Sequence, residues 1–162
     1  MKNQTPTLAD GSDTQEIAEL LNIELTILLS TEQSLRTALQ WMTRTRGNGH
    51  KLSTLRFHTW SFERHLTRIH ALADHGGYLH RITDANPHLS SRVDGLKKEQ
   101  TVLRDALEAI VMRLEFVSRD DAEAFAEVCK DLERLLDDLR RHGQQECELL
   151  QHSLMQEQGG SG

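Results

Sequence analysis

Residues 86–117 decide the fold class, and they read NPHLSSRVDGLKKEQTVLRDALEAIVMRLEFV. A capping residue, Asn86, is followed by Pro87, which suits the first position of a helix, so a helix is expected to begin here. Beyond it, apolar side chains recur in alternating steps of three and four residues, the pattern of a helix packed inside a bundle. The apolar positions are Leu89, Val93, Leu96, Leu103, Leu107, Ile110 and Leu114. One polar residue, Gln100, interrupts this seam.

The same spacing predicts three other long helices, with glycine-rich turns after the first two. The expected ranges are 12–46, 51–75, 87–117 and 118–158, and Ser118, Asp120 and Asp121 are candidate caps for the last helix. Short joins between long helices favour antiparallel neighbours. The sequence therefore predicts an all-α fold, an antiparallel up-down-up-down four-helix bundle.

Length and composition favour one domain and a limited set of partners. A chain of 162 residues has room for one sizeable core, expected over 12–158, with flexible tails at 1–11 and 159–162. The formal net charge of -6, with Lys and Arg scattered among acids, argues against a nucleic-acid partner. No apolar run approaches the roughly 20 residues that cross a bilayer, and no secretory signal begins the chain. We therefore expect a cytoplasmic protein with no membrane partner.

Polar side chains interrupt the inward stripes of three helices. On the first, Glu32 interrupts the apolar seam Leu21, Leu25, Leu28, Leu35, Leu39 and Met42. Gln100 lies on the third, and His142 and Glu146, one helical turn apart, lie on the fourth. Because a buried carboxylate must be neutralised, hydrogen-bonded or bound to metal, two explanations arise. Either the residues coordinate an ion such as iron or manganese, or they form a hydrogen-bonded polar layer. In the second case, replacing Glu32 by Gln should leave stability unchanged or raise it.

The second helix can contribute to this layer in one of two ways. In the first, Ile69 and Ala73 face the interior as part of the apolar seam, and the helix supplies no ligand. One position further on, His70 and Asp74 repeat the one-turn spacing of His142 and Glu146 at the edge of the seam.

Three segments resemble a known family. Residues 142–160, HGQQECELLQHSLMQEQGG, are similar to the closing helix of bacterial hemerythrin-like (HHE cation-binding) domains, in which a ligand His precedes Glu by four residues. ADHGGYL at 73–79 and NPHLSSRVDGLKKEQTVLRDAL at 86–107 resemble the passage between the second and third helices of that family. The resemblance covers about 65–160. It implies a non-haem di-iron or related metal centre used for oxygen binding, oxygen or redox sensing, or iron handling.

The chain departs from the family pattern at two ligand positions. Gln100 and Glu32 stand where the family has His, and an amide is a poor ligand for iron. Phase and resemblance agree on His142 and Glu146 as metal ligands, and helix phase adds Glu32 as a third. His70 and Asp74 raise the number to five if the second helix is placed one position further on, with Gln100 in the surrounding polar layer. These could hold one iron or another divalent ion, or none.

Two functions are consistent with this pattern. The first is a hemerythrin-like sensory, storage or partner-binding module that binds metal weakly or not at all and carries no catalytic residues. The alternative is a metal-dependent, oxygen- or redox-responsive protein. Ile17, Leu20, Ile27 and Leu29 also widen the apolar face of the first helix, which is consistent either with a broad bundle face covered by its neighbours or with a homodimer contact.

Overall fold

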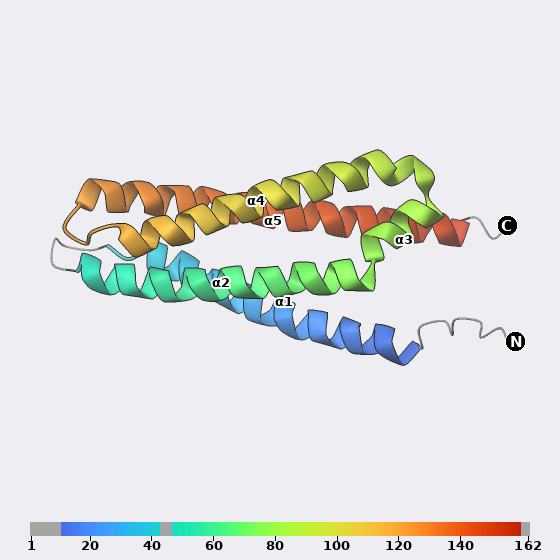
Figure 1. Ribbon diagram of the computed structural model, residues 1–162, viewed down its shortest axis with the longest axis horizontal. Helices are drawn as coiled ribbons and strands as arrows, with labels where there is room; N and C mark the ends of the chain where they lie inside the picture. The colour runs from blue at the N-terminus through green and yellow to red at the C-terminus, as the bar shows by residue number, and fades with distance from the viewer. Residues whose placement is uncertain (1–10, 43–46, 160–162) are drawn as a thin grey trace, which may run out of the picture.

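The computed structural model describes residues 11–42 and 47–159, and the regular structure within them is entirely helical. The long helices are α1 (Gly11–Leu39), α2 (Asn48–Gly76), α4 (Ser90–Phe116) and α5 (Ala122–Gly159). They alternate in direction, so that α1 begins and α5 ends at the same end of the molecule (Figure 1). The predicted all-α four-helix bundle is confirmed. Within the described residues, no helix combines the length and apolar character that crossing a bilayer would need.

Glycine ends α2 and turns the chain toward the third long helix. Gly77 has a φ of 63°, in the left-handed region that glycine adopts without strain, and its N–H donates to the carbonyls of Ala73 and Asp74. The turn is the expected one, but the chain then forms a short helix that was not predicted, α3 (Tyr78–Ala85). It buries Leu79 and Ile82, and this burial compensates for its small size.

The start of α4 differs slightly from the prediction. Residues 84 and 85 still belong to α3, and the helix expected from Pro87 begins with a 3-10 turn, Pro87–Leu89. α5 begins as expected, because the Asp121 carboxylate accepts a hydrogen bond of 3.0 Å from the backbone N–H of Ala124.

The first helix is shorter than predicted. α1 ends at Leu39, before the expected Arg46, and residues 43–46 lie outside the described part of the chain. The predicted tails fall largely on 1–10 and 160–162, also outside it, whereas Gly11 and Gly159 belong to α1 and α5.

Two apolar clusters fill the interior. The larger joins all four long helices and includes Leu35, Leu55, Leu107, Leu114, Leu132 and Leu136. The smaller lies where α3 meets α4 and α5, and includes Leu79, Ile82, Val93, Leu96 and Leu149. Along α5, His142 falls between the two clusters, so the chain places its polar residues at the boundary between two apolar layers.

The amino-terminal part of α1 diverges from the bundle. α1 packs mainly along α2, contacts α5 over a shorter stretch, and runs away from the other helices toward its beginning (Figure 1). Leu25, expected in the inner seam, is consequently exposed. Met42, also expected in the seam, lies beyond the end of α1 and is 99% exposed.

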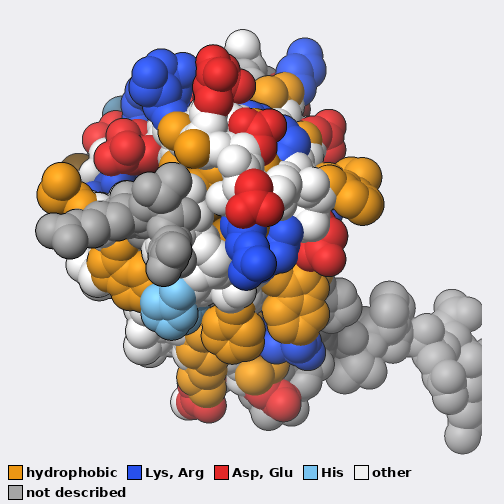
Figure 2. Space-filling view, turned by 90° about the vertical axis from the view of Figure 1, so that its left-hand side faces the viewer, with side chains coloured by type: hydrophobic (Ala, Val, Ile, Leu, Met, Phe, Trp, Pro, Cys, Tyr) orange, Lys and Arg blue, Asp and Glu red, His pale blue; other side chains and the backbone are white. Residues whose placement is uncertain are grey.

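Hydrophobic side chains also gather at the opposite end of the bundle. Figure 2 looks onto the end that carries the α1–α2 and α4–α5 connections, and shows them low on that face, beside a histidine. At the α1–α2 connection, Trp41 stacks on His50 with ring centroids 5.4 Å apart.

Candidate functional site

His142 is the most enclosed of the predicted site residues. It is 4% exposed, and both of its ring nitrogens face carboxylates. Nε2 lies 2.9 Å from Oε1 of Glu146, and Nδ1 lies 3.2 Å from Oε2 of Glu99 on α4. A protonated imidazole donates to both acids at once, because each nitrogen then carries a hydrogen.

Tyr78 completes the hydrogen bonding of Glu146. Its phenolic O–H, at the first residue of α3, donates to Oε2 of Glu146 over 3.0 Å. Both oxygens of that carboxylate are therefore engaged, one by α3 and one by its own helix. The short helix α3 thus positions a hydrogen-bond donor at the site.

His70 on α2 is the fifth group at this level of the bundle. Its side chain is buried, and Nδ1 has no hydrogen-bond partner within the described residues. Burial lowers the pKa of His70 to about 4; the nearby Glu146 opposes this effect, whereas Arg104 adds to it. At neutral pH His70 is accordingly uncharged.

We call His70, Tyr78, Glu99, His142 and Glu146 the polar centre. They come from α2, α3, α4 and α5, and none comes from α1. The polar centre connects α2 to α3, α4 and α5, which enclose the smaller apolar cluster. It lies between the two apolar clusters and belongs to neither.

Hydrogen bonding sets the charges of the polar centre. The bond with Glu146 raises the pKa of His142, the bond with Glu99 acts in the same direction, and burial partly opposes them. Burial alone would raise the pKa of Glu146, but the hydrogen bonds from His142 and Tyr78 together lower it. Burial and the adjacent Glu146 raise the pKa of Tyr78, which therefore stays a donor. The centre thus favours a charged His142–Glu146 pair beside a neutral His70.

Of the two residues that the second alternative places at the site, helix two turns His70 into the interior and leaves Asp74 at the surface. His70 is buried, whereas Ile69 and Ala73 are only partly buried. Asp74 is exposed, although its charge is close enough to act on His70 and Tyr78.

Glu32 has partners of its own, away from His142. Its Oε1 lies 2.9 Å from Nη2 of Arg36 and 2.9 Å from Nη2 of Arg140, and Arg36 also binds Asp137. These ion pairs join α1 to α5 and compensate the negative charge of the buried carboxylate. On α4, Glu99 makes the contact with His142, and Gln100 beside it is partly exposed.

Sequence reasoning missed Tyr78 and Glu99. Glu99 precedes Gln100 by one residue, at the edge of the α4 seam, and its carboxylate contacts His142. Tyr78 follows the Gly-Gly turn, but its contact with Glu146 depends on a helix that the sequence pattern did not reveal. The aromatic residue after the turn was the available signal.

The donor set is chemically suited to a divalent ion, but its arrangement is not. Imidazole and carboxylate are good ligands for iron, zinc or manganese. Across residues 11–42 and 47–159, however, no group of three or more His, Cys, Asp or Glu side chains is placed so that it could hold a metal ion. The side chains bind one another instead.

Comparison with known proteins identifies no relative. No protein-family model, curated protein or solved structure matches the chain. The hemerythrin-like resemblance therefore remains a prediction based on the residues quoted above. What the polar centre can do follows from its chemistry: it can hold a proton on His142, and it can tie together the helices that supply it.

Proposed function

We propose that this chain is a hemerythrin-like helical bundle that serves as a non-catalytic partner-binding module, with a polar centre that binds metal weakly or not at all. The observation that carries this proposal is the double engagement of His142 by Glu99 and Glu146. A metal ligand must present a free lone pair, and the raised pKa of His142 means that a proton competes for that lone pair. The bonds within the centre therefore oppose metal binding.

The ion pairs of Glu32 support the same proposal. A metal site that included Glu32 would have to separate it from Arg36 and Arg140, both 2.9 Å away. Removing Glu32 from these pairs is costly, because Arg36, whose side chain is 20% exposed, would stay largely desolvated without its carboxylate. Glu32 is thus better suited to joining α1 and α5 than to coordination.

The surface for a partner is the amino-terminal part of α1. Five large apolar residues there are between 37% and 62% exposed: Leu20, Ile23, Leu25, Ile27 and Leu29. The stretch 20–29 contains a single ionisable residue, Glu24, which is paired with His65 and Arg68 on α2. An apolar stretch of this kind is typical of an interaction site.

The partner that fits this surface best is a second copy of the chain. In a twofold dimer the same patch meets itself, so the patch must not repel its own charges. The stretch 20–29 meets this condition, because its one charge is directed to α2.

The oligomeric state tests this partner. Light scattering after size exclusion should give the mass of a dimer for the unmodified chain, and of a monomer for an Ile23→Glu, Leu29→Glu double variant. Val102→Glu is the control, since Val102 is exposed on α4 and should leave the dimer intact. A monomer at all accessible concentrations, or a dimer that survives both α1 substitutions, would contradict the second-copy proposal.

Metal analysis tests the polar centre. Protein from iron-supplemented medium should contain far less than one equivalent of iron, and adding iron, manganese or zinc should leave its melting temperature unchanged. A ligand that binds only the native state must stabilise it, so an unchanged melting temperature reports weak or absent binding.

One observation favours the alternative, a metal-responsive protein. Nδ1 of His70 is buried without a hydrogen-bond partner in the described residues, as an unoccupied ligand atom would be. The alternative predicts stoichiometric iron that is lost in a His142→Ala, Glu146→Ala double variant and in His70→Leu. If that result is obtained, the proposal of a metal-free centre is wrong.

A further inference from the structure

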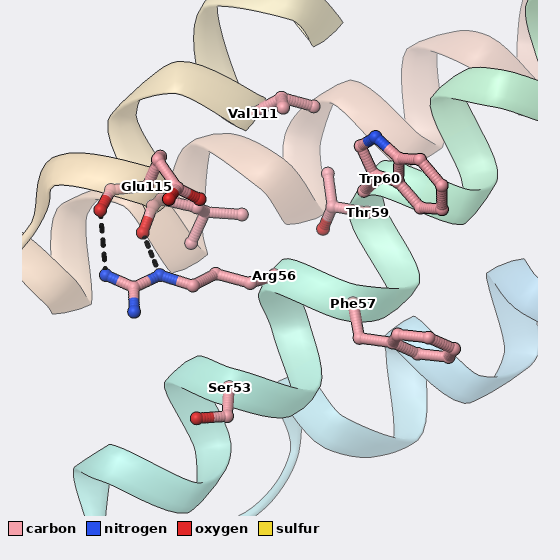
Figure 3. A pocket seen from close by; sticks show the side chains of 8 residues that line it. Ser53, Arg56, Phe57, Thr59, Trp60, Val111 and Glu115 are labelled. Atoms are coloured by element: carbon pink, nitrogen blue, oxygen red, sulfur yellow. Dashed lines mark hydrogen bonds between the residues drawn. The ribbon is translucent and has the colours of Figure 1, made fainter.

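A groove between α2 and α4 carries a polar atom that the bundle leaves unused. It has a volume of about 390 Å³ and lies beside Ser53, Arg56, Thr59, Trp60, Val111 and Leu114 (Figure 3). Trp60 and His70 are ten residues apart on α2, so the groove lies roughly 15 Å along the helix from the polar centre. It is thus a separate site.

Thr59 lies at the inner side of this groove and is unsatisfied. Its side chain is 0% exposed, and its hydroxyl has no hydrogen-bond partner within the described residues. A buried threonine in a helix usually bonds the carbonyl four residues earlier, and an unpaired hydroxyl in an apolar interior costs free energy. Thr59 nonetheless stands in the apolar seam of α2, between Leu55 and Phe62. The hydroxyl borders the groove but has no accessible surface, so a ligand in the groove reaches it by moving the covering side chains aside.

Arg56 supplies a cation at one end of the groove. Its Nε and Nη2 donate to the carbonyls of Leu114, Glu115 and Val117 at the end of α4. Nη1 makes no hydrogen bond with the described residues, and Figure 3 shows it pointing away from those carbonyls. The guanidinium is therefore held in place by two nitrogens, while the third remains a donor.

The walls of the groove are apolar and aromatic. Phe57 and Trp60 are 65% and 51% exposed, and Val111 and Leu114 face them from α4. The guanidinium carbon of Arg64 lies 5.5 Å from the ring centroid of Trp60, which adds a second cation near the opening. The carboxylate of Glu115 also lines the groove, and its negative charge opposes that of these two cations.

We infer that this groove binds a small organic carboxylate with an aromatic body. The ring packs against Trp60 and Phe57, the carboxylate accepts from Nη1 of Arg56, and the Thr59 hydroxyl hydrogen-bonds a carboxylate oxygen. A volume of about 390 Å³ is in the range of small-molecule sites, which are mostly apolar with a few fixed polar groups. An apolar ligand without a polar end would leave both Thr59 and Arg56 unused.

Binding of 3-phenylpropionate to the full chain tests the proposal. Tryptophan fluorescence in a Trp41→Phe background isolates Trp60, and calorimetry gives the affinity. The amine of the same shape, 3-phenylpropylamine, should bind at least about tenfold more weakly, since it meets two arginines. Equal affinity for the amine would overturn the assignment of an anion site.

Two variants separate the groove from the overall stability of the bundle. Thr59→Val keeps the shape and removes the hydroxyl, so it should raise the melting temperature and weaken binding about fivefold. Val111→Trp should fill the groove and weaken binding at least about tenfold, whereas Val102→Trp, at an exposed position of the same helix, should not. Circular dichroism verifies that each variant is folded. Unchanged binding in Val111→Trp would show that the ligand lies elsewhere and would overturn the proposal.

Discussion

Nε2 of His142 lies 2.9 Å from Oε1 of Glu146, one helical turn further along α5. The pair that the sequence predicts as two metal ligands is thus also a hydrogen-bonded pair, and Glu99 and Tyr78 satisfy its remaining positions. Hydrogen bonds among the side chains of the polar centre compensate for the free-energy cost of burying their charges. Its contribution to stability should consequently depend on pH.

Replacing His142 by Gln should destabilise the fold most strongly in mild acid. The pKa of His142 is raised in the folded protein, so its stabilisation is fully present below the unfolded value of 6.5 and is lost as the pH rises through the folded value. We expect a loss of about 2 kcal/mol at pH 5.5 and a smaller loss at pH 8.5. Urea unfolding at the two pH values measures this. His80→Gln is the control, because His80 is exposed, and a pH-independent loss would contradict the prediction.

Replacing His70 by Leu should have the opposite dependence on pH. The folded pKa of about 4 lies below the unfolded value of 6.5, so His70 supports folding above 6.5 and the unmodified protein loses that stability as the pH falls toward 4. The free energy of unfolding of the Leu variant, compared with that of the unmodified protein at the same pH, should be about 1 kcal/mol more favourable at pH 5.5 than at pH 8. Thermal unfolding across this range tests it, with His88→Leu as an exposed control. No relative gain in acid would show that His70 protonates without cost.

Replacing Glu32 by Gln should destabilise the protein, contrary to the expectation for an unpaired carboxylate. Because Arg36 and Arg140 both contact Oε1 of Glu32, the substitution leaves the mostly buried Arg36 and the half-exposed Arg140 without this carboxylate. We expect a loss of about 2 kcal/mol in the free energy of unfolding. Glu127→Gln, at an exposed position of α5, should change it by less than about 0.5 kcal/mol. Equal effects of the two substitutions would mean that the ion pairs contribute nothing.

Replacing Arg56 by Gln should weaken the end of α4. Its guanidinium binds the carbonyls of Leu114, Glu115 and Val117, which the helix itself leaves without partners, and its charge is favourable at a helix carboxyl end. We expect a loss of about 2 kcal/mol. Arg64→Gln on the same helix removes only the contact with Trp60 and should cost about 0.5 kcal/mol. Hydrogen exchange of the last turn of α4 should rise in the first variant and stay unchanged in the second.

Periodicity predicted the parts of the fold that depend on one helix at a time. The apolar positions of α4, from Val93 to Leu114, are buried as expected, and so is His142 in the stripe of α5. Local signals also placed the turn at Gly77 and the cap at Asp121. Each of these depends on backbone geometry within a few residues, which the sequence carries directly.

Contacts between helices were predicted less well, because neighbouring positions on a helix differ by only about 100° and long side chains reach past the seam. Glu99 contacts His142, although Gln100 lies on the ideal stripe. On α2, the same ambiguity between Ile69 and His70 was resolved by burial of the histidine.

The sequence by itself determined that the chain forms four amphipathic helices with polar residues at a common level, since helix periodicity is a local property. Only the tertiary structure decided which of these residues meet: Tyr78 through α3 with Glu146, and Glu32 with Arg140. It also decided that the beginning of α1 leaves the bundle. The physical reason is that the relative shift and rotation of packed helices depend on side chains far apart in the chain, which no local pattern encodes.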